Sequence, residues 1–174
     1  MFIFITGGYR SGRSNYALRR AAELGPPPWL YATSGNETDE AVRKRIERHR
    51  RDREAIWRTL PLPEDWRELL ASPGLKGVGA AVFDGVVEWL EARLAKTPPG
   101  GEAALLDEVE VTADRLYRTK VPILVVSQEM GQAPHPTDPV GERLTHVVSS
   151  ANQILAGRAS GVVLMVSGVP LRVR

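Results

Sequence analysis

Short apolar runs alternate along the chain with longer amphipathic segments. Near-continuous apolar runs occupy residues 2–6, 29–32, 78–83, 121–127 and 161–167. Runs of this kind are typical of strands that are covered on both faces, as in a parallel sheet. The last segment, at residues 171–174, alternates between apolar and basic side chains, which predicts an edge strand.

Helical patterns fill the intervals between these strands. We predict helices at residues 14–24, 39–56, 86–95, 103–117 and 141–156. Strands and helices that alternate in this way predict an α/β fold of three layers, with a mostly parallel sheet flanked by helices. No repeat or linker divides the sequence, so we expect a single domain over residues 1–174.

Composition narrows the class of protein. The 174 residues carry a formal net charge of +2 and no cysteine, which excludes disulfides, thiolate catalysis and cysteine metal sites. No apolar run is long enough to span a bilayer. The first apolar run has no basic segment ahead of it, so we interpret it as a core strand rather than a signal peptide and expect a cytoplasmic protein.

A glycine-rich loop follows the first predicted strand and carries the clearest chemistry. It consists of Gly7, Gly8, Tyr9, Arg10, Ser11, Gly12, Arg13 and Ser14. This order matches the phosphate-binding pattern G-x-x-x-x-G-K-[ST], with arginine in place of lysine. In that pattern backbone N–H groups face phosphate oxygens, the cation reaches the outer phosphates, and the final hydroxyl ligates Mg²⁺. The alternative is a glycine-rich turn that binds no ligand.

Acidic residues follow two of the other predicted strands. In phosphate-loop proteins a carboxylate at a strand end holds Mg²⁺ opposite the loop hydroxyl, so Ser14 and Asp84 are the predicted metal ligands. Strand-end acids also cap helices, which is the alternative for Asp84. Glu129 is either a catalytic residue or a cap of its own loop.

A strongly basic helix is predicted over residues 39–56, with its acidic residues near the start. Val42, Ile46 and His49 share one face of it, which places the imidazole among apolar neighbours. Nearby cations disfavour protonation of an imidazole and stabilise an arriving phosphate, so His49 is a candidate nucleophile. The alternatives are a structural histidine and, for the basic run, a nucleic-acid-binding face, which a chain with a phosphate loop makes the less economical hypothesis.

Several local patterns together resemble one known family over almost the whole chain. They lie in the glycine loop at residues 6–14, the strand end at 31–34, the helix segment at 45–50, the Trp-x-Thr motif at 57–59, the turn at 126–131 and the end at 166–171. The chain is similar here to the bifunctional adenosylcobinamide kinase / adenosylcobinamide-phosphate guanylyltransferases of cobalamin biosynthesis. The helix with Arg45, Ile46 and His49 behind an Ala-Thr-Ser strand end distinguishes this family from other phosphate-loop kinases.

The resemblance implies a covalent mechanism. His49 would attack the α-phosphate of GTP, release pyrophosphate and hold GMP, which then passes to adenosylcobinamide phosphate. A kinase activity, using GTP or ATP, would phosphorylate the cobinamide hydroxyl at the same loop. The family also implies a RecA-like fold and a homotrimer. From the apolar runs and the phosphate loop we expect no membrane span and no nucleic-acid partner. The nucleotide contacts expected beyond the loop are Thr33, Ser34, Arg50, Arg53 and Asp84.

Departures from the family pattern affect the expected activities. Arg13 replaces the loop lysine, which we expect to weaken transfer of the γ-phosphate most. Leu60 and Pro61 stand where the family carries a glutamate suited to guanine, and Gln128 stands where it carries asparagine. These changes leave two alternatives open: a nucleotide-binding protein of the same fold without turnover, and a small-molecule kinase that uses ATP.

Overall fold

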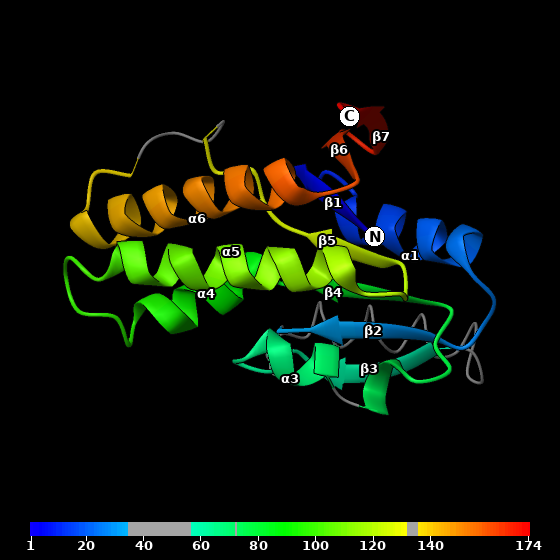
Figure 1. Cartoon of the computed structure of the whole chain (residues 1–174). Coiled ribbons are helices and arrows are strands. Elements are labelled where there is room, and N and C mark those ends of the chain that lie inside the picture. Colours follow the sequence, from blue (N-terminus) through cyan, green and yellow to red (C-terminus); the bar gives the residue numbers. More distant parts are fainter. Residues whose placement is uncertain (35–56, 72, 132–135) are drawn as a thin grey trace.

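The computed structural model describes residues 1–34, 57–71, 73–131 and 136–174, which form a three-layer α/β fold (Figure 1). Its sheet has seven strands in the order β3-β2-β4-β5-β1-β6-β7. Every neighbouring pair is parallel except β6 and β7, which are antiparallel. The strands are β1 (Phe2–Gly7), β2 (Trp29–Thr33), β3 (Trp57–Pro61), β4 (Ala80–Asp84), β5 (Ile123–Val126), β6 (Gly161–Val166) and β7 (Val169–Arg172).

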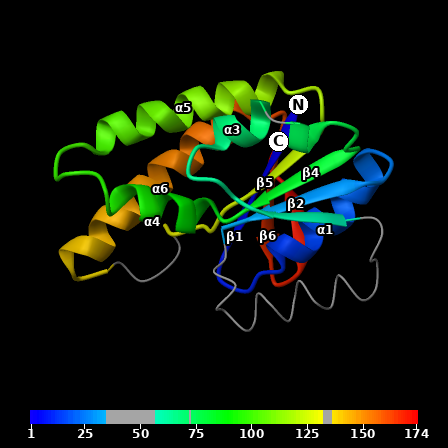
Figure 2. The same cartoon turned by 90° about the horizontal axis from the view of Figure 1, so that it is seen from below.

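Helices cover both faces of the sheet, as the sequence predicts (Figure 2). On one face α1 packs against β1, β4 and β5, with Ala17, Leu18 and Ala21 buried. The other face carries the remaining helices, and alternate strand residues such as Phe2 and Phe4 point into this second apolar core. The helices are α1 (Arg13–Leu24), α3 (Trp66–Ala71), α4 (Val86–Leu94), α5 (Glu102–Arg118) and α6 (Pro139–Arg158), with a short 3₁₀ helix at Pro73–Leu75.

Most of the predicted elements are confirmed, with ends that shift by one or two residues. The helix predicted at residues 39–56 lies outside the described residues. The edge strand occupies Val169–Arg172 rather than residues 171–174. The reason is a tight turn at Ser167 and Gly168, whose φ angles of 49° and 87° close a two-residue hairpin and start the return strand earlier.

The sequence patterns did not predict β3 and α3. Strand β3 pairs with β2 at the edge of the sheet, and four of its five residues are exposed, so it lacks the apolar run that marks a covered strand. Helix α3 has only six residues, of which Trp66 and Leu69 are buried. Six residues are too few to show a helical period.

The carboxyl ends of the parallel strands meet along one edge of the sheet. Thr33 at the end of β2 pairs in register with Asp84 of β4 and with Pro61 of β3. Asp84 in turn pairs with Val126 of β5, and the glycine loop leaves β1 beside β5. In α/β sheets this edge is where ligands bind, so the fold gathers the predicted site residues of β1, β2 and β4 in the expected place.

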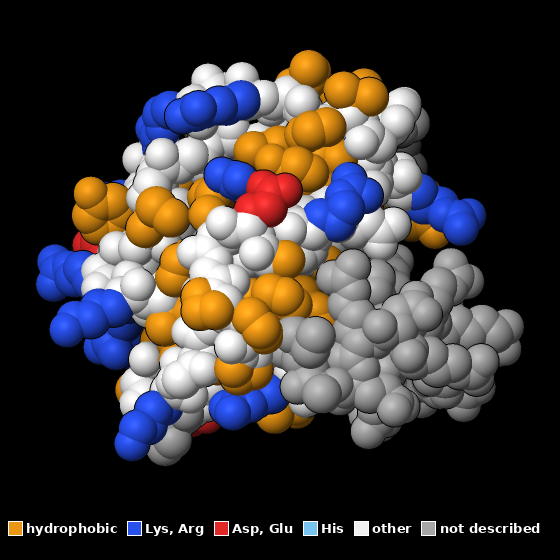
Figure 3. All heavy atoms as spheres, turned by 90° about the vertical axis from the view of Figure 1, so that its right-hand side faces the viewer, with side chains coloured by type: hydrophobic (Ala, Val, Ile, Leu, Met, Phe, Trp, Pro, Cys, Tyr) orange, Lys and Arg blue, Asp and Glu red, His pale blue; other side chains and the backbone are white. Residues whose placement is uncertain are grey.

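Figure 3 shows the side of the molecule that lies on the right in Figure 1. Strand β2 points away from this side. Hydrophobic side chains are scattered over that face, and its charged side chains are mostly Lys and Arg. Positive charge is therefore not confined to the loop edge. Among the described residues, no helix combines the length and the apolar character that crossing a membrane would require.

Candidate nucleotide site

The backbone of the glycine loop depends on two of its glycines. Gly7 and Gly12 have φ angles of 154° and 91°, which side-chain-bearing residues rarely adopt. A Cβ atom at Gly7 would also lie 2.4 Å from the carbonyl oxygen of Met165. The loop closes with a hydrogen bond from Ser11 N to Gly8 O (3.2 Å) and leads directly into α1. The first turn of that helix therefore faces the loop, as in a phosphate site.

Neighbouring strands brace this loop on both sides. Glu129 N donates to Gly7 O at 2.9 Å, and Gly168 N donates to Ser11 O at 2.9 Å. The Ser11 hydroxyl is buried and has no hydrogen-bond partner among the described residues. Tyr9 at the loop tip is instead 81% exposed. The loop thus has a fixed base and an open tip.

Arg13 points toward the end of β5. Its Nη1 donates to Ser127 O at 2.6 Å, and its Nη2 donates to Gln128 Oε1 at 3.3 Å. Asn152 of α6 contacts both of these residues: Ser127 Oγ donates to Asn152 Oδ1 at 2.6 Å, and Asn152 Nδ2 donates to Gln128 O at 2.8 Å. We refer to Arg13, Ser127, Gln128 and Asn152 as the Arg13 network.

The sequence analysis did not assign a role to Ser127 or Asn152. Both side chains are buried, with 2% and 6% of their surface exposed. A signal for Asn152 was present, because it is a polar residue on a helix face otherwise formed by Val148, Ala151 and Leu155. An amide at such a position requires polar partners, which the end of β5 provides.

Thr33, Ser34 and Asp84 come together at the ends of β2 and β4, on the side of β5 away from the loop. The hydroxyl of Tyr31 donates to Asp84 Oδ2 at 2.8 Å, and Ser34 N donates to Asp84 O at 3.2 Å. The N-cap residue of α4 is Gly85, which has no side chain, so Asp84 is not the N-cap residue of that helix. Its carboxylate instead stands at the strand end with Tyr31 orienting it.

Two further carboxylates lie near this edge. Glu129 Oε1 accepts a hydrogen bond from Gly131 N at 3.2 Å, which favours the loop-capping interpretation of Glu129. Glu88, in the first turn of α4, was not predicted. Glu88 is an exposed residue, but desolvation of its carboxyl raises the pKa above its ordinary value; the nearby Asp84 carboxylate adds to the shift, and Arg13 opposes it. Glu88 thus belongs to the electrostatic surroundings of Asp84 and Arg13.

The basic-helix residues of the predicted site, His49, Arg50 and Arg53, lie outside the described residues. Of the remaining histidines, His146 is exposed on α6. The part of the chain that the structure describes contains no group of three or more His, Asp and Glu side chains that could hold a metal ion. Ser14 and Asp84 therefore stay the predicted pair of protein ligands there.

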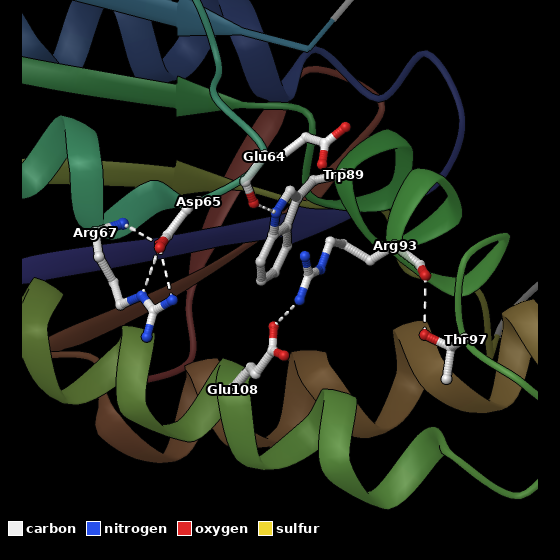
Figure 4. Close-up of polar contacts among 7 residues, drawn as sticks. All are labelled: Glu64, Asp65, Arg67, Trp89, Arg93, Thr97 and Glu108. Carbon is white, nitrogen blue, oxygen red and sulfur yellow. Dashed lines mark hydrogen bonds and ion pairs between the residues drawn. The ribbon is translucent and has the colours of Figure 1, made fainter.

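A recess of about 400 Å³ opens between α3, α4 and α5, and none of the predicted site residues line it. We call it the acidic recess; its main side chains are Glu64, Asp65, Arg67, Trp89, Arg93 and Glu108 (Figure 4). Asp65 pairs with Arg67 at 2.6 Å, Arg93 pairs with Glu108, and Trp89 Nε1 donates to Glu64 O at 2.8 Å. These contacts brace the three helices.

Comparison with known sequences finds one family that matches almost the whole chain. A family described as cobinamide kinase / cobinamide phosphate guanyltransferase matches residues 3–173. The bifunctional adenosylcobalamin biosynthesis protein CobP of Pseudomonas aeruginosa is 32% identical over 96% of the chain and 94% of its own length. The corresponding CobU proteins of Salmonella typhimurium and Escherichia coli are 28% and 26% identical over the full length of both sequences.

Comparison with solved structures agrees on the fold. A KaiC-like protein of the hyperthermophilic archaeon Pyrococcus horikoshii aligns with a TM-score of 0.51 and 14% identity, covering 94% of this chain and 71% of that protein. This likeness supports the RecA-like arrangement of the sheet.

Proposed function

The chain belongs to the cobinamide kinase / cobinamide phosphate guanyltransferase family, and from that premise we propose that it transfers GMP from GTP to adenosylcobinamide phosphate through His49. It is an enzyme of the kinase and nucleotidyltransferase class. The observation that carries the proposal is the glycine loop at the start of α1, with the Arg13 guanidinium held beside it. A loop, a helix N-terminus and a cation together favour a triphosphate.

Phosphate binding has support in the loop itself. Gly7 and Gly12 adopt the backbone conformations that the loop requires, and the buried Ser11 hydroxyl is positioned in it without a protein partner among the described residues. A buried hydroxyl is normally hydrogen-bonded, and a phosphate oxygen would accept a hydrogen bond from the Ser11 hydroxyl. Tyr9 and Arg10 at the open tip, together with Gly8, complete the proposed cradle.

Ser14 and Asp84 are the proposed holders of Mg²⁺. A hydroxyl and a carboxylate are oxygen ligands, which Mg²⁺ prefers, and Tyr31 orients the Asp84 carboxylate through its hydrogen bond to Oδ2. When bound, Mg²⁺ would offset the negative charge of the phosphates. Thr33 and Ser34, which leave β2 beside Asp84, are proposed to contact the rest of the nucleotide.

Transfer would proceed in two displacements. A neutral nitrogen of His49 attacks the α-phosphorus of GTP, a P–N bond forms, and the P–O bond to the β-phosphate breaks with release of pyrophosphate. A phosphate oxygen of adenosylcobinamide phosphate then attacks the same phosphorus, the P–N bond breaks, and His49 is regenerated. Arg50 and Arg53, on the same predicted helix, would stabilise the negative charge that develops.

The kinase activity of the family would use the same loop with GTP or ATP. Arginine keeps the positive charge of the usual lysine but not its compact shape, so we propose that γ-phosphate transfer to the cobinamide hydroxyl is the weaker activity. We further propose a single domain over residues 1–174 that acts in the cytoplasm, and a homotrimer, which the resemblance of the sequence implies.

Intact-protein mass spectrometry tests the covalent step. The purified protein, His49→Ala and the matched control His146→Ala are incubated with GTP and Mg²⁺, and with ATP in parallel. We expect a GMP-sized mass increase on the wild type and on His146→Ala, and none on His49→Ala. A protein that binds GTP but gains no mass would contradict the proposal and favour a nucleotide-binding protein without turnover.

A further inference from the structure

The Arg13 network joins three segments that are far apart in the sequence. Arg13 begins α1, Ser127 and Gln128 follow β5, and Asn152 lies on α6. Four hydrogen bonds of 2.6, 3.3, 2.6 and 2.8 Å form a closed circuit through these residues. The circuit connects the start of α1, which covers one face of the sheet, with α6 on the other face.

Asn152 holds the two residues that accept hydrogen bonds from Arg13, through other atoms than those that Arg13 contacts. Its Oδ1 accepts from the hydroxyl of Ser127, and its Nδ2 donates to the backbone carbonyl of Gln128. These two contacts hold in place the two residues whose oxygens accept hydrogen bonds from Arg13 Nη1 and Nη2. Because Asn152 and Ser127 are almost completely buried, their hydrogen bonds face little competition from water, and breaking them leaves polar groups without partners.

A guanidinium must be oriented to act on phosphates. Arginine presents five N–H donors in a rigid fork, so its useful direction is set by the acceptors that hold part of the fork. Arg13 gives Nη1 to Ser127 and Nη2 to Gln128. Its orientation at the loop therefore depends on how firmly the end of β5 is held.

We propose that Asn152 is a positioning residue for phosphate binding, acting on Arg13 through Ser127 and Gln128. This inference rests on the proposed function, which assigns Arg13 to the phosphates of the nucleotide. It adds a residue of α6 that does not itself touch the substrate. The geometry that carries it is the closed circuit of buried hydrogen bonds.

A double-mutant cycle tests the proposal with magnesium pyrophosphate, a probe that needs no transfer step. Its dissociation constant is measured by calorimetry for the wild type, Asn152→Ala, Arg13→Met and the double variant. We expect Asn152→Ala to weaken binding about fivefold, the amount that one lost hydrogen bond typically costs. In the Arg13→Met background the same change should have almost no effect, because Asn152 acts through Arg13.

Two further variants test this interpretation, one that breaks a single link of the network and one that serves as a control. Ser127→Ala removes the hydroxyl that donates to Asn152 but keeps the carbonyl that accepts from Arg13, so it breaks one link and decides the question if Asn152→Ala does not fold. We expect it to weaken binding by a smaller factor that also disappears in the Arg13→Met background. Gln153→Ala, at the exposed neighbouring position on α6, is the matched control and should leave binding unchanged.

Equal losses with and without Arg13 would overturn the proposal, as would a wild-type protein that does not bind pyrophosphate. The proposed function and the role of Asn152 can be contradicted independently of each other. Coupled pyrophosphate binding without a GMP adduct would contradict transfer through His49 and leave the role of Asn152 intact. An adduct without coupling between Asn152 and Arg13 would do the reverse.

Discussion

The Arg13 network and the acidic recess are both built around arginine, but they are built differently. Arg13 is held by neutral acceptors, a backbone carbonyl and an amide, supported by side chains that are almost fully buried. Arg93 in the recess is paired with the carboxylate of Glu108, and these side chains are 30% and 47% exposed. Both of these acceptors of Arg13 are therefore neutral oxygens, whereas Arg93 is held by an opposite charge.

This difference indicates why the acidic recess and the candidate nucleotide site are separate parts of the molecule. An arginine that meets an incoming phosphate needs a fixed direction and a charge that no carboxylate has already paired. The Arg13 network meets the need for a fixed direction at the carboxyl edge of the sheet. Ion pairs at a partly exposed recess contribute little stability each, and they join helices without preparing a site for an anion.

The largest expected effect comes from disturbing the loop that carries Arg13 to its network. Gly7→Ala places a Cβ atom 2.4 Å from Met165 O at a φ of 154°, so we expect a loss on the order of 3 kcal/mol in the free energy of unfolding. Gly8→Ala is the matched control, since a Cβ atom there meets nothing within 4 Å. Denaturant unfolding measures both, and equal stabilities for the two variants would contradict the account.

Removing the two arginines compares the clusters directly. We expect Arg13→Met to weaken binding of magnesium pyrophosphate on the order of 10- to 100-fold, because hydrogen bonds to a charged group are lost. Arg93→Met removes the same charge from the recess and should leave the dissociation constant unchanged. Calorimetry provides both values. Similar losses in the two variants would mean that only net charge matters.

A smaller effect is expected within the recess. Glu108→Gln removes the ion pair with Arg93, and the free energy of unfolding should fall by less than about 1 kcal/mol, since the pair is partly exposed. Added salt should reduce the difference further. A loss of several kcal/mol that is insensitive to salt would show that the recess is a tightly coupled structural centre.

The smallest effects are changes of the unfolding free energy with pH. They have opposite signs for Glu88, near Arg13, and for a carboxyl of the acidic recess. Desolvation and the Asp84 charge raise the pKa of Glu88 above its ordinary 4.5, so its charged form is disfavoured in the folded protein. The stability that the protonated form contributes is lost as the pH rises through this raised pKa. Glu88→Gln should therefore become more stable than the wild type as the pH increases from about 4 to 7, measured by urea unfolding.

Asp65 of the recess provides the opposite case. The hydrogen bond from Arg67 lowers the pKa of Asp65 below its ordinary 3.8, so its stability contribution is present above that pH and is lost as the pH falls. Asp65→Asn should be less stable than the wild type at neutral pH, and the difference should shrink in acid. The same sign for Asp65 and Glu88 would contradict these electrostatic assignments.

The fold and the loop could be predicted from sequence because their signals are local. Covered strands show as apolar runs, and the glycine loop shows as a fixed spacing from Gly7 to Ser14. The edge strand β3 was not predicted, because its exposed residues form no apolar run. Arg13 was predicted as a phosphate cation, a role that stays a prediction, and its contacts with Ser127 and Gln128 could not be predicted. They join residues more than a hundred positions apart, which only the pairing of β1 with β5 brings together.

The central claim is that this chain passes GMP from His49 to a corrinoid phosphate. The most direct measurement loads the protein with GTP labelled at the α-phosphate, removes free nucleotide and then adds adenosylcobinamide phosphate. The account predicts that label leaves the protein and appears in adenosylcobinamide-GDP in equal amount. Label that stays on the protein, or that is released without entering the corrinoid, would contradict it.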